Sequence, residues 1–120
     1  MVEDDRDTRD IICTTLECEG YMVLQAENGR DAMNVLLAQT QPVRLIVSDL
    51  DMPEMSGGAF IHVLSSYFRL SRIPVVVISG VLPPEGEPRF EGKVVGVLRK
   101  PFELAALLDI VSANAEPALN

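Results

Sequence analysis

The stretch Leu45-Ile46-Val47-Ser48-Asp49-Leu50-Asp51-Met52-Pro53 decides the fold that this chain can adopt. It begins with an aliphatic run, which predicts a buried strand, and continues with two acids before Pro53 ends regular structure. In an open α/β sheet, ligands bind beyond the carboxyl ends of the parallel strands. Asp49 is therefore the first candidate for chemistry, although an aspartate at a strand end can also simply cap the loop that follows.

The composition indicates one domain with an aliphatic core. The chain has 120 residues, of which 48% are hydrophobic and only 5% aromatic, as in a parallel sheet covered by helices. Its net charge of −8 argues against direct nucleic-acid binding, which needs clustered Lys and Arg. The same charge favours a cation or a basic partner surface, and it also serves solubility.

The sequence predicts no association with a membrane. No run approaches the roughly 18 apolar residues of a membrane span, and no signal peptide is visible. Cys13 and Cys18 lie five positions apart on one predicted helix, so they point to different faces and neither has a ligand partner at metal spacing. We expect reduced thiols and a cytoplasmic location.

Apolar segments of strand and helix type alternate along the chain. Predicted strands cover residues 1–2, 21–25, 44–48, 73–79 and 94–98, and predicted helices cover about 6–19, 29–39, 60–68 and 103–113. Residues 83–88 contain three prolines and a glycine, which a stable helix would not tolerate. This alternation predicts an α/β fold, a parallel sheet with helices on both faces.

Polar side chains follow the predicted strands at their carboxyl ends, which parallel strands bring to one edge of the sheet. They are Glu3, Asp4, Asp49, Asp51, Ser79 and Lys100. Carboxylates that lie so close together repel one another unless a cation binds between them. A ligand set made only of oxygen atoms selects a hard ion such as Mg²⁺. A lysine and a hydroxyl can hold phosphoryl oxygens, so the set suits phosphoryl transfer to a carboxylate.

These motifs together resemble the receiver domain of two-component response regulators. The markers are Glu3-Asp4, Asp49-x-x-Met52-Pro53 with Gly57 following, Ser79-Gly80, and Lys100-Pro101-Phe102, in order along nearly the whole chain. The resemblance implies a doubly wound, flavodoxin-like sheet of five parallel strands in the order 2-1-3-4-5. It also implies a receiver domain over residues 1–114, followed by a polar tail or linker over residues 115–120.

The resemblance further implies a role for each site residue. Asp49 would accept a phosphoryl group from a phosphohistidine of a sensor histidine kinase or a histidine phosphotransfer protein. Asp4, Asp49 and the backbone carbonyl of Asp51 would ligate Mg²⁺, and Glu3 would act through water. Ser79 and Lys100 would hold phosphoryl oxygens, so that the domain switches partner interactions and catalyses only its own phosphorylation and dephosphorylation.

Three features depart from the receiver pattern. Only Met1 and Val2 precede the acidic pair, where the family has a full strand. Either the first strand is truncated or the native start of the chain has been lost, and we expect reduced stability or a homodimer that fills the gap. The proline-rich residues 83–88 predict a short or irregular fourth helix. Val97 stands where the family has an aromatic residue, which excludes the aromatic switch of that family at this position.

Two other functions fit parts of the sequence. The Asp49-x-Asp51 pair after an apolar strand also resembles the nucleophile motif of haloacid-dehalogenase-type phosphohydrolases, with Ser79 and Lys100 as the next motifs. That family needs a further acidic motif downstream of the lysine. The only acids after Lys100 are Glu103, Asp109 and Glu116. The third possibility is a receiver fold that is not phosphorylated and serves only as an interaction module.

Overall fold

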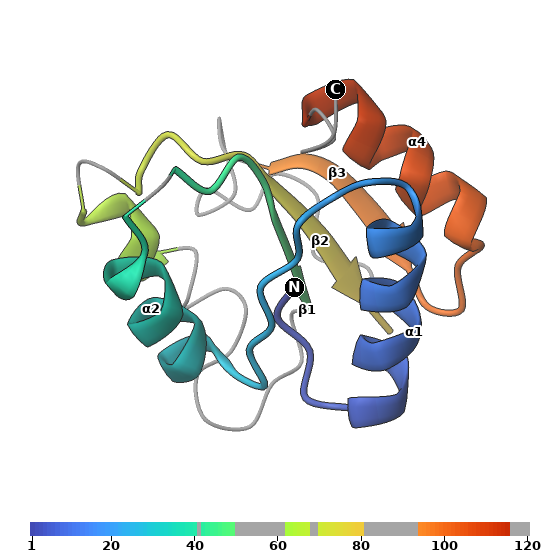
Figure 1. The fold of residues 1–120 in the computed structure, drawn as a ribbon, viewed down its shortest axis with the longest axis horizontal. Coiled ribbons are helices and arrows are strands. Elements are labelled where there is room, and N and C mark those ends of the chain that lie inside the picture. The colour runs from blue at the N-terminus through green and yellow to red at the C-terminus, as the bar shows by residue number, and fades with distance from the viewer. Residues whose placement is uncertain (41, 50–61, 68–69, 81–93, 116–120) are drawn as a thin grey trace.

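The computed structural model describes residues 1–40, 42–49, 62–67, 70–80 and 94–115 of the chain. Three strands, β1 (Ile46–Asp49), β2 (Val75–Ser79) and β3 (Val94–Arg99), form the centre of the molecule (Figure 1). The helices are α1 (Arg6–Cys18), α2 (Gly29–Ala38) and α4 (Leu104–Asn114), and residues 62–65 form a further helical turn. No helix in these described ranges is both long and apolar enough to cross a membrane.

The sheet is parallel, and the segments lie in the order that the resemblance implied. β1 pairs with β2 and β2 with β3, both in parallel. On the other side of β1, Val2 forms parallel bridges with Ser48 and with Ala26. The order across the sheet is therefore the segment at Ala26, the segment at Val2, β1, β2 and β3, which is the doubly wound 2-1-3-4-5 arrangement.

Helices cover both faces of the sheet, as Figure 1 shows, and alternate residues of each strand serve the two faces. Val75 and Val77 belong to a buried cluster with side chains of α2, whereas Val76 and Ile78 belong to a cluster with side chains of α1 and α4. All five residues of β2 are buried, which explains why its sequence is a continuous apolar run rather than an alternating one.

Local sequence determines where the first two helices begin. The side chain of Asp5 accepts a hydrogen bond from the backbone N–H of Thr8 and so caps α1, and Asn28 caps α2 by accepting from the N–H of Asp31. After α1 the chain turns at Gly20, whose φ of 94° favours a residue without a Cβ. The cap of α1 places the acidic residues 3–5 immediately before that helix.

The prediction of a strand over residues 21–25 is wrong. Apart from the isolated bridge at Ala26, these residues form no strand. A strand needs a ladder of hydrogen bonds with a neighbour, and the neighbouring segment, Met1 and Val2, is only two residues long. The first strand is truncated as expected. The predicted features at residues 83–88 and 116–120 lie outside the described residues. Of the predicted helix over 60–68, residues 62–65 are helical, and residues 60, 61 and 68 lie outside the described residues.

Candidate functional site

The acidic turn after Val2 is fixed by backbone hydrogen bonds to both neighbouring segments. The N–H of Val2 donates to the carbonyl of Val47 at 2.8 Å, and the N–H of Glu3 donates to the carbonyl of Ala26 at 3.0 Å. The guanidinium of Arg9, one helical turn into α1, donates to the carbonyl of Glu3 at 2.7 Å. These bonds hold the turn in place although the strand that leads into it is short.

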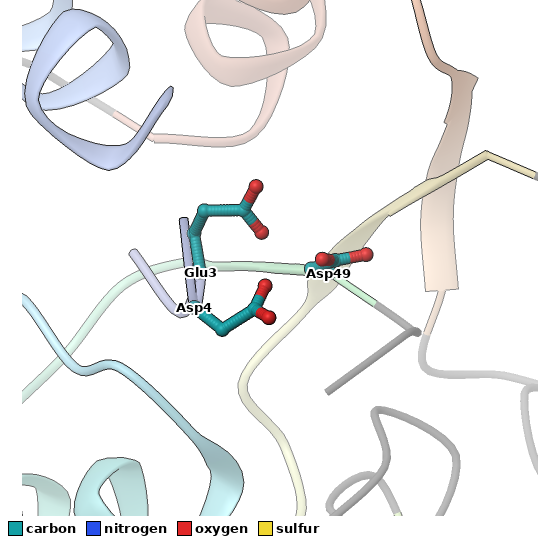
Figure 2. A group of neighbouring side chains, drawn as sticks. All are labelled: Glu3, Asp4 and Asp49. Atoms are coloured by element: carbon teal, nitrogen blue, oxygen red, sulfur yellow. The ribbon is translucent and has the colours of Figure 1, made fainter. Parts of the chain in front are cut away.

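Asp49 is the last residue of β1 and lies beside the acidic turn. Its N–H donates to the carbonyl of Val2 at 2.9 Å, so its backbone continues the pairing between the two segments. Carboxylate oxygens of Glu3, Asp4 and Asp49 all lie within 4.8 Å of one another. Figure 2 shows these three side chains close together, with those of Glu3 and Asp4 extending from the turn toward Asp49 at the strand end.

Lys100 belongs to the same cluster and comes from the end of β3, the strand on the other side of β2 from β1. Its backbone N–H donates to the carbonyl of Ser79 at 2.8 Å, which continues the pairing of β2 with β3. Its ammonium Nζ lies 2.8 Å from Oε1 of Glu3 and 3.2 Å from Oδ2 of Asp49. One partly exposed cation therefore contacts two buried carboxylates that are 46 residues apart in the sequence.

Burial and charge shift the pKa values of this cluster. Burial first, and the adjacent Asp49 carboxyl second, raise the pKa of Glu3 to about 7, against the opposing effect of Lys100. Burial acts to lower the pKa of Lys100, but its hydrogen bond to Glu3 and the negative charge of Asp49 outweigh that effect and raise it. The lysine therefore stays charged near neutral pH, and Glu3 holds a proton more readily than an ordinary glutamate does.

The donor set of this site fits a hard divalent cation. All the groups are carboxylate oxygens, without histidine or cysteine, and they include the exposed side chain of Asp4, which a hydrated ion can reach. Oε2 of Glu3 is buried without a hydrogen-bond partner among the described residues. A buried oxygen without a donor is costly, and a metal ion or its bound water would satisfy it.

The other predicted site residues, Ser79 and Asp51, are not part of the acidic cluster that the structure describes. Ser79 ends β2, where it is buried and lies one position beyond Ile78, the residue that pairs with Asp49. Asp51 lies outside the described residues. Glu103 and Asp109, which a phosphohydrolase motif would require near the lysine, are exposed beside and on α4, and the described acidic cluster does not include them.

Sequence reasoning missed two contacts of this site. It assigned Lys100 to phosphoryl oxygens and Glu3 to a bound water, whereas the two side chains form an ion pair across 97 positions of sequence. It gave no role to Arg9, which lies in a helix with several other charged residues and carries no distinguishing pattern. Only the folded chain reveals that its guanidinium reaches back to the acidic turn.

Comparison with known proteins places these features in a family context. The sequence model of the family described as the response regulator receiver domain matches residues 1–112. A probable transcriptional regulatory protein of Picosynechococcus is 34% identical over 116 residues, which cover 90% of this chain and 45% of that protein. The response regulator protein FleR of Pseudomonas aeruginosa is 31% identical, over 96% of this chain and 24% of that protein. The chain thus spans less than half the length of these two relatives.

Solved structures are similar over nearly the whole chain. The chemotaxis protein CheY4 of Vibrio cholerae superposes with a TM-score of 0.84 at 27% identity, covering 95% of this chain and 94% of that one. A response regulator receiver protein of Pseudomonas putida gives a TM-score of 0.83 at 26% identity, covering 93% and 92% of the two chains. The likeness therefore extends to both helix layers and to the sheet between them.

Proposed function

The chain belongs to the family of response regulator receiver domains, and from this premise we propose that Asp49 is its phosphoacceptor. The observation that carries the proposal is the set of charges around this carboxylate. Two further acids lie within 4.8 Å of it and an ammonium lies 3.2 Å from its Oδ2. Such a set can bind a cation and the phosphoryl group of a donor beside the same carboxylate.

The cation that we propose is Mg²⁺. Asp4 and Asp49 would hold it directly together with the backbone carbonyl of Asp51, and Glu3 would act through a bound water. Bound there, Mg²⁺ would offset the negative charge of the acids and of the phosphoryl oxygens. The buried, unpartnered Oε2 of Glu3 supports this assignment, because a bound water or ion would satisfy that oxygen.

The phosphoryl donor would be a phosphohistidine of a sensor histidine kinase or a histidine phosphotransfer protein. An oxygen of the Asp49 carboxylate attacks the phosphorus, a P–O bond forms as the P–N bond breaks, and the leaving imidazole takes up a proton. The carboxylate becomes an acyl phosphate, and the negative charge then lies on the phosphoryl oxygens. Lys100, which pairs with Oδ2 before the reaction, would then pair with a phosphoryl oxygen, and the Ser79 hydroxyl would donate to another.

This change of partners gives the domain a route to signalling. Lys100 follows β3 directly, and its N–H is bonded to Ser79 at the end of β2, so both proposed phosphoryl contacts lie on neighbouring strand ends. A movement of either side chain toward the phosphoryl group would pull on these two strands. We propose that this receiver domain covers residues 1–114, with residues 115–120 as a polar tail or linker.

Phosphorylation by a small donor tests the proposal directly. Incubation with acetyl phosphate and Mg²⁺, followed by intact mass measurement, should add the mass of one phosphoryl group. Asp49→Asn should abolish the addition and Asp4→Asn should reduce it at least about tenfold, because each removes a carboxylate from the site. Asp109→Asn, which removes an exposed carboxylate from α4, is the matched control and should leave phosphorylation unchanged.

Two outcomes would contradict this function. A protein that gains no phosphoryl mass at any acetyl phosphate concentration would be an interaction module with the receiver fold. Steady turnover of a phosphomonoester, instead of a single stoichiometric addition, would indicate a phosphohydrolase of the haloacid-dehalogenase type.

A further inference from the structure

Arg9 reaches the acidic turn from helix α1, whereas the other groups of the site come from the turn itself and from strand ends. Its Nη1 donates to the backbone carbonyl of Glu3 at 2.7 Å, in a contact that is partly buried. Within the described residues, no ion pair joins this guanidinium to a carboxylate. Its hydrogen bond therefore goes to the backbone of the site and not to one of the charged side chains.

The position of Arg9 in α1 explains this reach. The side chain of Asp5 caps the helix, and the N–H of Arg9 donates to the carbonyl of Asp5 at 2.9 Å, which closes the first turn. Helical side chains tilt toward the N-terminus of their helix, so a long side chain at the end of the first turn extends back over the residues that precede the helix. The cap and the guanidinium together connect α1 to the acidic turn.

The carbonyl that Arg9 binds belongs to the peptide between Glu3 and Asp4. That peptide unit is planar, so a hydrogen bond on its oxygen restricts the backbone rotation of both residues. The N–H of Glu3 is held as well, by the carbonyl of Ala26 at 3.0 Å. Both backbone polar groups of Glu3 are thus bonded, one to a neighbouring segment of the sheet and one to α1. The directions in which the two acidic side chains leave the turn depend on these bonds.

We propose that Arg9 is a positioning residue of the cation site, which holds the carboxylates of Glu3 and Asp4 beside Asp49 through the Glu3 carbonyl. This inference rests on the proposed Mg²⁺ site, and it assigns no contact between Arg9 and the ion. Asp4 depends on the backbone most. Lys100 also holds the side chain of Glu3, whereas the exposed side chain of Asp4 has no hydrogen-bond partner among the described residues.

The charge of Arg9 and its positioning role have opposite effects on cation binding. A positive charge near the site repels a divalent ion and by itself weakens its binding. Positioning strengthens binding, because the carboxylates are already ordered when the ion arrives. Outer partners that orient metal ligands are typically worth about 10- to 100-fold in metal affinity. A solvent-screened charge is worth about fivefold at most, so the loss of positioning should outweigh the loss of charge.

The test measures the dissociation constant of Mg²⁺ for the folded protein, from the amide chemical shifts of residues 3–5 during a titration at constant ionic strength. Arg9→Met removes the donor and the charge but keeps an unbranched side chain, and it should raise the dissociation constant about tenfold. Arg6→Met is the matched control, since it removes the same charge from the same helix at a side chain that is 83% exposed. It should change the constant by less than about twofold.

A further variant separates the donor from the charge. Arg9→Lys retains both a positive charge and a hydrogen-bond donor, so it should bind Mg²⁺ more tightly than Arg9→Met. If only the charge of Arg9 mattered, the order of these two variants would be reversed, because the lysine would still repel the ion.

Three results would overturn the role of Arg9. The first is equal or tighter Mg²⁺ binding by Arg9→Met than by the original protein, and the second is binding by Arg9→Lys that is no tighter than by Arg9→Met. The third is an Arg9→Met protein that does not fold at any Mg²⁺ concentration, which would make Arg9 a residue of the fold alone. An original protein that binds no Mg²⁺ would instead reject the proposed cation site itself, and this inference with it.

Discussion

Lys100 contacts Glu3 and Asp49 at the same time, and this triplet determines the electrostatics of the site. Both acids are buried and repel each other, and the lysine is the cation that the described structure places between them. A buried charge group of this kind adds little to stability in itself, because desolvation offsets the attraction. Its arrangement instead keeps Asp49 paired until another charge, such as a phosphoryl group, competes for the lysine.

The raised pKa of Glu3 predicts a dependence of stability on pH in protein without metal. The pKa is about 7 in the folded protein and ordinarily 4.5, so between these values the folded state binds more protons than the unfolded state. The stabilising contribution is therefore complete below about pH 4.5 and is lost as the pH rises through about 7. Urea unfolding should give a fall of about 1–3 kcal/mol between pH 5 and pH 7.5 from this group.

Glu3→Gln should remove that fall, since an amide does not titrate. Glu17→Gln, which changes an exposed acid of α1, serves as the matched control and should retain the pH dependence of the original protein. The amino group of Met1 has a lowered pKa and contributes in the opposite direction, but it is the same in all three proteins. If the free energy of unfolding fell equally with pH in Glu3→Gln and in the original protein, Glu3 would not be the group that causes the pH dependence.

At the scale of elements, the contact between β3 and α4 depends on a glycine. A Cβ added at Gly96 would lie 2.9 Å from Cγ2 and 3.1 Å from Cδ1 of Ile110. These separations are shorter than van der Waals contact, so the absent side chain allows the helix to pack closely on the strand. The position of α4 matters for the site because Lys100 lies in the connection between these two elements.

Gly96→Ala should therefore destabilise the protein by about 1–3 kcal/mol in urea unfolding, as overpacking does in other cores. In an unconstrained strand the same substitution would instead stabilise, because alanine loses less backbone entropy than glycine. Ile110→Ala removes both clashing carbons. In that background the cost of Gly96→Ala should fall by at least about 1 kcal/mol. An unchanged cost would mean that Ile110 does not limit the packing.

At the scale of the whole molecule, the net charge of −8 and the acidic cluster predict that folding is coupled to cation binding. An ion that binds only the folded state stabilises it in proportion to the logarithm of its concentration. Mg²⁺ at ten times its dissociation constant should raise the free energy of unfolding by about 1.4 kcal/mol. NaCl at equal ionic strength controls for general screening of the negative charge.

The effect of Mg²⁺ should depend on the acids of the site and not on total charge. Asp4→Asn should abolish most of the stabilisation, whereas Asp109→Asn, which removes the same charge from α4, should preserve it. The measurement is the melting temperature with and without Mg²⁺ for each protein. Equal stabilisation of the two variants would indicate a diffuse ion atmosphere rather than a specific site.

The sequence by itself determined the fold class, the helix layers and which polar residues stand at the strand ends. Burial could be predicted from local patterns, such as the continuous apolar run of β2 and the four-residue spacing of Ile12 and Leu16. The structure confirms that these residues are buried. The identity of the acids and of the lysine, and their positions at strand ends, were also readable, because parallel strands all end at one edge. The family match confirms the receiver fold.

Only the tertiary structure decided which of these residues touch and which strands form. The ion pair between Glu3 and Lys100 joins distant parts of the chain, and no local period encodes it. Residues 21–25 have the composition of a strand but lack a partner of sufficient length, and the space beside them remains a cavity. A side chain's preference is local, whereas a strand exists only when its neighbour supplies the other half of each hydrogen bond.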